Sequence, residues 1–133
     1  GFLIGPAVTK EQESDVEYAM RIAREISRLE IGQSVVVRSG TVLAVEAFEG
    51  TDECLKRGGE LAGKDGGAAA AKVAKTDHDF RFDIPCIGPQ TLETCAAAKI
   101  SVLAIEAGKT LVLEQQQVED LAKMHRISLV AVS

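Results

Sequence analysis

Apolar residues near the start of the chain recur every three or four positions, at Val16, Ala19, Met20, Ala23, Ile26 and Leu29. This spacing places them on one face of a helix. The preceding Thr9-Lys10-Glu11-Gln12 has the capping-box pattern, and Gly32 marks the end of the helix. Two runs rich in β-branched residues follow, at 34–38 and 41–47. Because Ser39-Gly40 lies between them, we predict a hairpin with a tight turn.

The rest of the chain alternates between helical patterns and short apolar runs. A helix capped by Thr51 or Asp52 is predicted to run to about Ala62, and further helices are predicted from Pro89 to about Ala98 and over residues 116–125. Strands are predicted over residues 68–75, 101–105, 111–113 and 128–132. This alternation indicates the α/β class, and the hairpin makes the sheet mixed. We expect a mixed β-sheet covered by helices in a single domain over residues 9–133, with residues 1–8 as a lead-in or interdomain linker.

Residues 77–85 combine acidic, basic and aromatic side chains in one extended pattern. Side chains alternate across a strand, so Asp79, Arg81 and Asp83 project from one face while Phe80 and Phe82 project from the other. Carboxylates that flank a guanidinium suit work on a phosphate, because carboxylates hold hard cations and arginine binds oxyanions. The same alternation is also typical of an ordinary solvated strand face with internal ion pairs.

A second group of acids lies where the predicted strand 41–47 leads into the next helix. Glu46, Glu49 and Asp52 surround a glycine turn in this segment. Clustered carboxylates repel one another unless a cation or a basic group offsets their charge. The segment is therefore a second candidate for cation-dependent chemistry. Phe48, within it, is predicted to pack in the core.

Several other positions are candidates for binding a phosphate. Lys75 ends a predicted strand, and Lys109 lies in Gly108-Lys109-Thr110. That tripeptide resembles the end of a phosphate loop, but we reject the motif because the chain has Leu103 where glycine is required. The helix start at Gly88-Pro89-Gln90-Thr91 offers backbone amides to an anion. His78 is a candidate general base, with a solvated turn residue as the alternative.

Charge and cysteine usage narrow the class of protein. The 15 basic and 20 acidic residues give a net charge of -5, which argues against broad, nonspecific binding to nucleic acid or anionic lipid. The apolar runs are too short to span a bilayer. Cys54, Cys86 and Cys95 lack the paired spacing of a zinc site or a disulfide framework. We expect a reduced, cytoplasmic protein in which the cysteines are packing residues.

Five segments, taken in order, resemble the carboxy-terminal domain of the LpxI family, the UDP-2,3-diacylglucosamine pyrophosphatases of lipid A biosynthesis. They are residues 31–37, 43–52, 79–85, 87–91 and 106–110. The resemblance covers nearly the whole chain. The ordered set is more specific than any one of its segments.

The resemblance implies magnesium-dependent hydrolysis of UDP-2,3-diacylglucosamine, which releases UMP and 2,3-diacylglucosamine 1-phosphate. This reaction would take place in the cytoplasm at the inner membrane, with peripheral membrane contact through the lipid substrate. The resemblance also implies an amino-terminal domain, an active site between the two domains, and a homodimer. Because the chain opens at Gly1 without an initiator methionine, we expect it to be part of a longer protein in which that domain precedes it.

The residue chemistry and the resemblance together give a hypothesis for the site. Hydrolysis of a phosphoanhydride needs a cation that offsets charge, a positioned water, and donors around the transferred group. The predicted catalytic acids are Asp79, Asp83, Glu46 and Asp52, and the predicted magnesium ligands are Asp79, Asp83 and Glu49. The predicted substrate-binding residues are Arg81, Lys75, Lys109, Thr51, Gln90 and Thr91. The alternative is a non-catalytic ligand-binding or dimerisation module with structural ion pairs.

Overall fold

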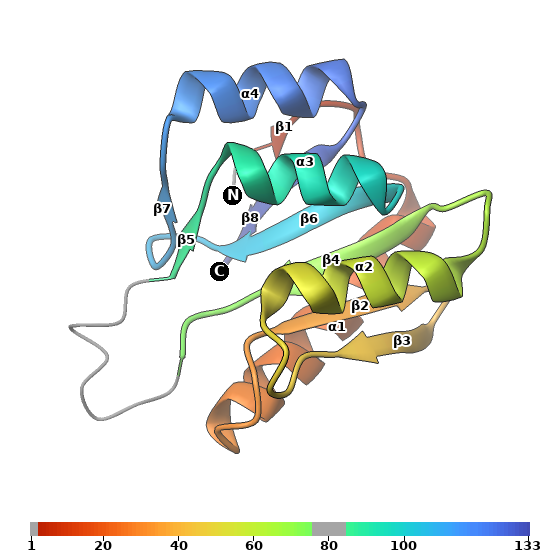
Figure 1. Ribbon diagram of the computed structural model, residues 1–133, viewed down its shortest axis with the longest axis vertical. Helices are drawn as coiled ribbons and strands as arrows, with labels where there is room; N and C mark the ends of the chain where they lie inside the picture. Colours follow the sequence, from red (N-terminus) through yellow and green to blue (C-terminus); the bar gives the residue numbers. More distant parts are fainter. Residues whose placement is uncertain (1–2, 76–84) are drawn as a thin grey trace.

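The computed structural model describes residues 3–75 and 85–133. Among these residues, six strands form one mixed sheet in the order β1-β8-β6-β4-β2-β3, and β5 pairs with β7 in a separate parallel sheet (Figure 1). The strands are β1 (Leu3–Ile4), β2 (Ser34–Arg38), β3 (Thr41–Val45), β4 (Ala68–Lys72), β5 (Cys86–Ile87), β6 (Ile100–Glu106), β7 (Leu111–Val112) and β8 (Ser128–Val132). The helices are α1 (Lys10–Arg28), α2 (Thr51–Ala62), α3 (Pro89–Ala97) and α4 (Gln115–Met124). The predicted α/β class with a mixed sheet is confirmed.

Helix α1 covers one face of the sheet, and α2, α3 and α4 cover the other (Figure 1). Successive side chains of β2 pack alternately against the α1 side and the α2 side of the sheet. Val35 and Val37 pack with the apolar face of α1, whereas Val36 packs in the layer that contains Leu55 of α2. The sheet is therefore covered by helices on both faces, which is typical of sheets that contain parallel strands.

Small residues let the helices approach the sheet closely. Ala68–Ala71 of β4 are fully buried between β2 and β6. A Cβ added to Gly58 of α2 would lie 2.5 Å from the Cβ of Val36, and one added to Gly59 would lie 2.4 Å from the carbonyl oxygen of Ala98. Helix α2 can lie against β2 and the end of α3 because these two positions carry no side chain.

The predicted hairpin between β2 and β3 is confirmed. Its turn residues Ser39 and Gly40 have φ angles of 50° and 76°. Positive φ at both central residues is typical of two-residue hairpin turns. Asp15 of α1, which is only 4% exposed, holds the turn: its carboxylate accepts the N–H of Ser39 at 2.9 Å and that of Gly40 at 2.8 Å.

Some predicted element boundaries were wrong. Strand β3 ends at Val45, and β4 ends at Lys72 because the next N–H groups bond to a loop carbonyl and to a side chain. Leu29 is 52% exposed because α1 ends at Arg28, before Leu29 can join the buried stripe. Strand β7 is likewise one residue shorter than predicted.

Two further predictions, which concern the loop before α2, were also wrong. Neither Thr51 nor Asp52 caps α2, because the N-cap residue is Gly50 and the cap has no side-chain hydrogen bond. Phe48 is not a core residue, since it is fully exposed at the loop between β3 and α2.

Near the amino terminus, Leu3–Ile4 form β1, which pairs antiparallel with β8. The role of residues 1–8 as an interdomain linker stays a prediction.

Replacing Asp15 tests how much this carboxylate contributes to stability. Asp15→Ala should lower the free energy of unfolding by about 2 kcal/mol, because hydrogen bonds to charged groups contribute roughly 1.5–3 kcal/mol. The measurement is urea denaturation. Glu17→Ala, which removes an exposed acid from the same helix, is the control and should stay within about 0.5 kcal/mol of wild type. Equal stability of the two variants would contradict this account of the turn.

Candidate active site

The carboxyl ends of several strands meet at one edge of the sheet. Strands β4, β6 and β8 are mutually parallel, and β3 runs in the same direction because both it and β4 are antiparallel to β2. Helices α2, α3 and α4 begin on this side of the molecule (Figure 1). In open α/β sheets, ligands bind at the carboxyl ends of the strands. We call this region the carboxyl edge.

Glu46 directly follows β3 and is a hydrogen-bonding centre of the carboxyl edge. The residue is 8% exposed, and its Oε1 accepts the hydroxyl of Ser34 at 2.6 Å, the hydroxyl of Thr51 at 3.3 Å and the backbone N–H of Gln33 at 3.3 Å. These three donors satisfy the hydrogen-bonding needs of a buried carboxylate oxygen. Glu46 thereby links the strand β2, the residue before it and the first turn of α2.

The first turns of α2 and α3 are joined by predicted site residues. The side-chain amide of Gln90 donates to a carboxylate oxygen of Asp52 at 3.3 Å. Thr91 supports the start of α3, because its hydroxyl accepts the N–H of Gly88 at 3.2 Å and its own N–H donates to the Gly88 carbonyl at 3.0 Å. The structure therefore brings Glu46, Thr51, Asp52, Gln90 and Thr91 to the carboxyl edge.

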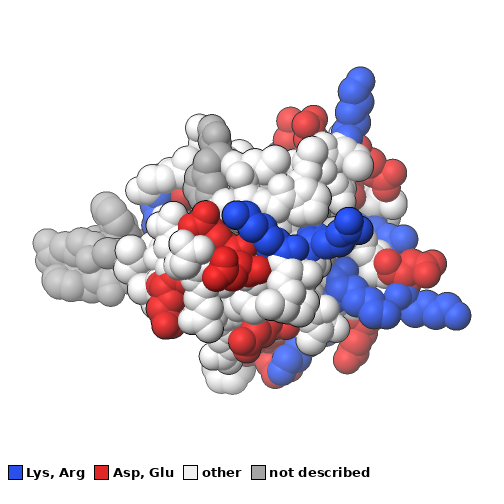
Figure 2. Space-filling model, turned by 90° about the horizontal axis from the view of Figure 1, so that it is seen from above, with Lys and Arg blue, Asp and Glu red and all other residues white. Residues whose placement is uncertain are grey.

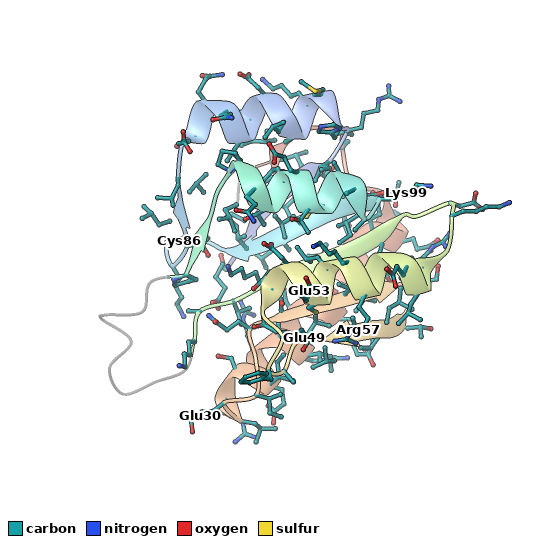
Figure 3. The ribbon with its side chains drawn as sticks, in the orientation of Figure 1. Glu30, Glu49, Glu53, Arg57, Cys86 and Lys99 are labelled. Atoms are coloured by element: carbon teal, nitrogen blue, oxygen red, sulfur yellow. The ribbon has the colours of Figure 1, made fainter. Side chains whose placement is uncertain are left out.

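Glu49 is held by partners outside this group. Its carboxylate forms an ion pair with Arg57 of α2 and accepts the N–H of Ala47 at 2.9 Å (Figure 3). The Ala47 N–H and then the Arg57 guanidinium lower the pKa of the Glu49 carboxyl from its ordinary value. The guanidinium of Arg57 also donates to the carbonyl of Val45 at 2.9 Å. Arg57 thus holds the loop between β3 and α2 in place.

Lys75 lies across a shallow cleft from Glu46. The cleft has a volume of about 250 Å³, and its lining residues are Ser27, Glu30, Ile31, Gly32, Gln33, Glu46, Ala47 and Lys75. Its walls come from the end of α1, the segment between α1 and β2, the loop after β3 and the chain that leaves β4. An acid and a cation predicted for the site therefore share one cavity.

A second buried carboxylate, which our sequence reasoning did not assign to the site, ends β6. Glu106 is 7% exposed and accepts the N–H of Ala74 at 2.7 Å. Its other oxygen lies 3.3 Å from Nε of Arg24 and 4.0 Å from Nζ of Lys109. The signal was available, because Glu106 follows an apolar run just as Glu46 does. Lys109 therefore reaches the carboxyl edge through Glu106.

The remaining predicted site residues lie outside the described part of the chain. These are Asp79, Arg81 and Asp83, together with the candidate base His78. The described residues on either side of them are held at the carboxyl edge. Lys72 donates to the carbonyl of Cys86 at 2.9 Å, which ties β4 to β5.

Residues 3–75 and 85–133 hold no complete metal site. Within these ranges, no group of three or more His, Cys, Asp or Glu side chains is placed to share an ion. Glu46 and Glu106 are engaged by protein donors, and Glu49 is paired with Arg57. Glu49, the one predicted magnesium ligand in the described part, therefore does not suffice by itself.

Two of the three cysteines are packing residues, as predicted. Cys54 and Cys95 are fully buried in the layer under α2 and α3. Burial raises the pKa of Cys54 to about 11 and that of Cys95 to about 12. Both thiols therefore stay protonated at neutral pH, so neither provides a thiolate nucleophile.

The face seen in Figure 2 carries acidic side chains among its basic ones rather than a uniformly basic surface. Among the described residues, no helix combines the length and apolar character needed to cross a bilayer.

Comparison with solved structures defines the class of protein. The crystal structure of a dCMP deaminase from the cyanophage S-TIM5, in apo form, matches with a TM-score of 0.50 and 14% sequence identity, covering 90% of this chain and 98% of that one. At this identity the likeness concerns the fold alone. The protein is thus a mixed α/β domain of deaminase-like architecture, with its candidate site at the carboxyl edge.

Sequence comparison places the chain in a family. The model of the LpxI C-terminal domain matches residues 1–130, so the chain belongs to the LpxI family. The UDP-2,3-diacylglucosamine pyrophosphatase LpxI of Caulobacter vibrioides is 41% identical over 114 residues, which are 81% of this chain and 41% of that relative. The chain therefore spans less than half the length of this relative. The family membership predicted from the five ordered segments is confirmed.

Thiol labelling tests the burial of the cysteines. With iodoacetamide at pH 8, Cys54 and Cys95 should remain unmodified in the folded protein, because each is buried and its pKa is raised to about 11 or 12. Cys86, which is only half-buried, should be labelled first. Peptide mass spectrometry identifies the modified residues, and labelling in urea is the control for complete reaction. Rapid labelling of Cys54 or Cys95 without denaturant would contradict the structure.

Proposed function

We propose that this domain takes part in hydrolysis of the pyrophosphate bond of UDP-2,3-diacylglucosamine, as one domain of a two-domain enzyme of lipid A biosynthesis. The products would be UMP and 2,3-diacylglucosamine 1-phosphate. The main support is membership of the LpxI family over residues 1–130, since a relative at 41% identity carries the name of this activity. The convergence of Glu46, Asp52 and Gln90 at the carboxyl edge adds structural support.

The proposed roles follow from charge and placement. Lys75 and Lys109, with Arg81, would bind oxygens of the diphosphate, because cationic donors form charge-assisted hydrogen bonds to phosphate. Asp52 would orient a water or a substrate hydroxyl, with its carboxylate held in place by Gln90. Thr51 and Thr91 would bind the substrate at the helix starts, where backbone amides favour anions. Asp79 and Asp83 would supply the acids closest to the reaction.

We propose magnesium as the cofactor, held mainly by Asp79 and Asp83. Carboxylate oxygens are the ligands that magnesium prefers, and the ion would offset negative charge on the diphosphate. The described residues contribute no complete ligand set. Glu49 could join such a set only by leaving Arg57, with which it is paired. Asp79 and Asp83 therefore carry this part of the proposal.

The proposed partners follow from the same family relation. They are the UDP-linked diacylated glucosamine, an amino-terminal domain that would complete the active site, and a second copy of the protein in a homodimer. The substrate carries acyl chains, so we place the enzyme in the cytoplasm in peripheral contact with the inner membrane. No nucleic acid is required by this reaction.

Substitution of the two central acids tests the catalytic proposal. In the complete protein, Asp79→Asn and Asp83→Asn should each lower kcat for UMP release by about a hundredfold or more, the contribution expected of an acid or base at the reaction centre. Asp65→Asn, in the exposed loop between α2 and β4, is the matched control and should retain wild-type turnover. Near wild-type rates in both folded variants would show that these acids do not carry the reaction.

A second candidate function, a non-catalytic ligand-binding or dimerisation module, is favoured by a specific observation. Glu49 with Arg57 and Glu106 with Arg24 are the structural ion pairs that such a module would contain. The two functions differ in their response to ligands. The enzyme must bind magnesium and a uridine diphosphate, whereas a module of this kind has no need of either.

Thermal unfolding with magnesium chloride and UDP-N-acetylglucosamine separates these candidates. For the enzyme, the two ligands together should raise the unfolding temperature, because a ligand at 100 times its Kd stabilises the folded state by about 2.7 kcal/mol. Potassium chloride at equal ionic strength is the control. An unchanged unfolding temperature with magnesium, the nucleotide sugar and their mixture would favour the module.

A further inference from the structure

Val73 and Ala74 are the two residues that follow β4, and each of their backbone N–H and C=O groups forms a hydrogen bond. The N–H of Val73 donates to the carbonyl of Gln33 at 2.8 Å, and its carbonyl accepts the side-chain amide of Gln33 at 3.2 Å. The N–H of Ala74 donates to Glu106 at 2.7 Å, and its carbonyl accepts the hydroxyl of Ser27 at 2.7 Å. Such complete pairing is expected inside a sheet, yet this dipeptide lies beyond the strand.

The groups that hold the dipeptide come from three separate parts of the fold. Ser27 belongs to α1, Gln33 precedes β2, and Glu106 ends β6. Glu106 is the charged member of this set. A hydrogen bond from a backbone N–H to a buried carboxylate is shorter and stronger than a neutral one. The ion pair with Arg24 at 3.3 Å fixes the carboxylate in turn.

The dipeptide leads directly to a residue of the candidate site. Lys75 follows Ala74 and lines the cleft that also contains Glu46. Gln33 connects both sides of this cleft, since its backbone N–H donates to Glu46 and its side chain bonds to Val73. A shift of Ala74 would therefore move Lys75 relative to Glu46.

We propose that Glu106 is a positioning residue of the active site, which acts through the Ala74 N–H to set the place of Lys75 in the cleft. This inference rests on the proposed function for its effect on turnover. Misplacement of a substrate-binding group by about 1 Å can lower the rate by about a hundredfold. Glu106 itself need not touch the substrate.

A purely structural role for Glu106 is the competing explanation, and Asp15 provides the comparison. Asp15 is also a buried carboxylate that accepts backbone N–H groups, but it holds the Ser39-Gly40 turn at the opposite end of β2. If Glu106 served stability alone, the two acids would behave alike. A positioning residue differs from Asp15 in its effect on kcat per folded molecule.

The test compares Glu106→Ala, Glu106→Gln and Asp15→Ala in the complete protein. Glu106→Ala should lower kcat for UMP release from UDP-2,3-diacylglucosamine by tenfold to about a hundredfold. Glu106→Gln keeps an acceptor oxygen for the Ala74 N–H and should recover most of this loss. Asp15→Ala should lose stability but keep wild-type kcat at a temperature where it is folded. Equal kcat losses in the alanine and glutamine variants, or wild-type kcat in both, would overturn the inference.

Two further measurements distinguish a loss of positioning from misfolding and from failure of the proposed function. Ser27→Ala, which removes the other side-chain bond to Ala74, should lower kcat in the same direction and serves if Glu106→Ala fails to fold. Hydrogen exchange followed by mass spectrometry should show faster exchange in a peptide that covers residues 73–75 of Glu106→Ala, and unchanged exchange there would overturn the inference. A wild-type protein that releases no UMP would instead contradict the proposed function. The hydrogen-exchange measurement would still decide whether Glu106 anchors Ala74.

Discussion

The distance between the two covering layers is set by the small side chains at the middle of the sheet. Ala68–Ala71 form almost the whole of β4, and each is fully buried. Methyl groups fill the space above and below this strand, so α1 can approach from one face and α2 from the other. Gly58 and Gly59 extend the same constraint to α2, where any Cβ would meet Val36 or Ala98. Close packing at the centre thus fixes how α1 and α2 lie against the sheet.

The carboxyl edge depends on that fixed geometry. Glu46 and Glu106 follow or end strands on either side of β4, and each is buried among hydrogen-bond donors. Buried carboxylates are costly unless they are paired and hydrogen-bonded. Each also accepts a backbone N–H from outside the helices and strands, that of Gln33 for Glu46 and that of Ala74 for Glu106, and so holds a connecting segment in place. Among the described residues, hydrogen bonds to these two acids therefore fix the carboxyl edge at Gln33 and Ala74.

Much of the fold could be predicted from local patterns. The 3.6-residue spacing of α1 and the Ser39-Gly40 turn are short-range signals, and both led to correct elements. The end of β4 at Lys72 could not be predicted, since it depends on Gln33 and Glu106, which are distant in sequence. The exposure of Phe48 contradicts the general preference of aromatic side chains for the core, and nothing in its neighbours signals that exception.

The site was predicted less completely, for a related reason. Residue type and position in the turn before α2 suggested Glu46 and Asp52, and in the structure Glu46 accepts a hydrogen bond from Thr51 and Asp52 accepts one from Gln90. Glu106 escaped attention because its partners, Arg24 and Ala74, lie 82 and 32 positions away.

The Asp15 contacts also matter for the order in which the chain folds. They close loops of only 24 and 25 residues, and shorter loops cost less entropy to close. Helix α1 and the hairpin thus form a low-contact-order unit, which favours early folding of this part and later docking of the remaining strands.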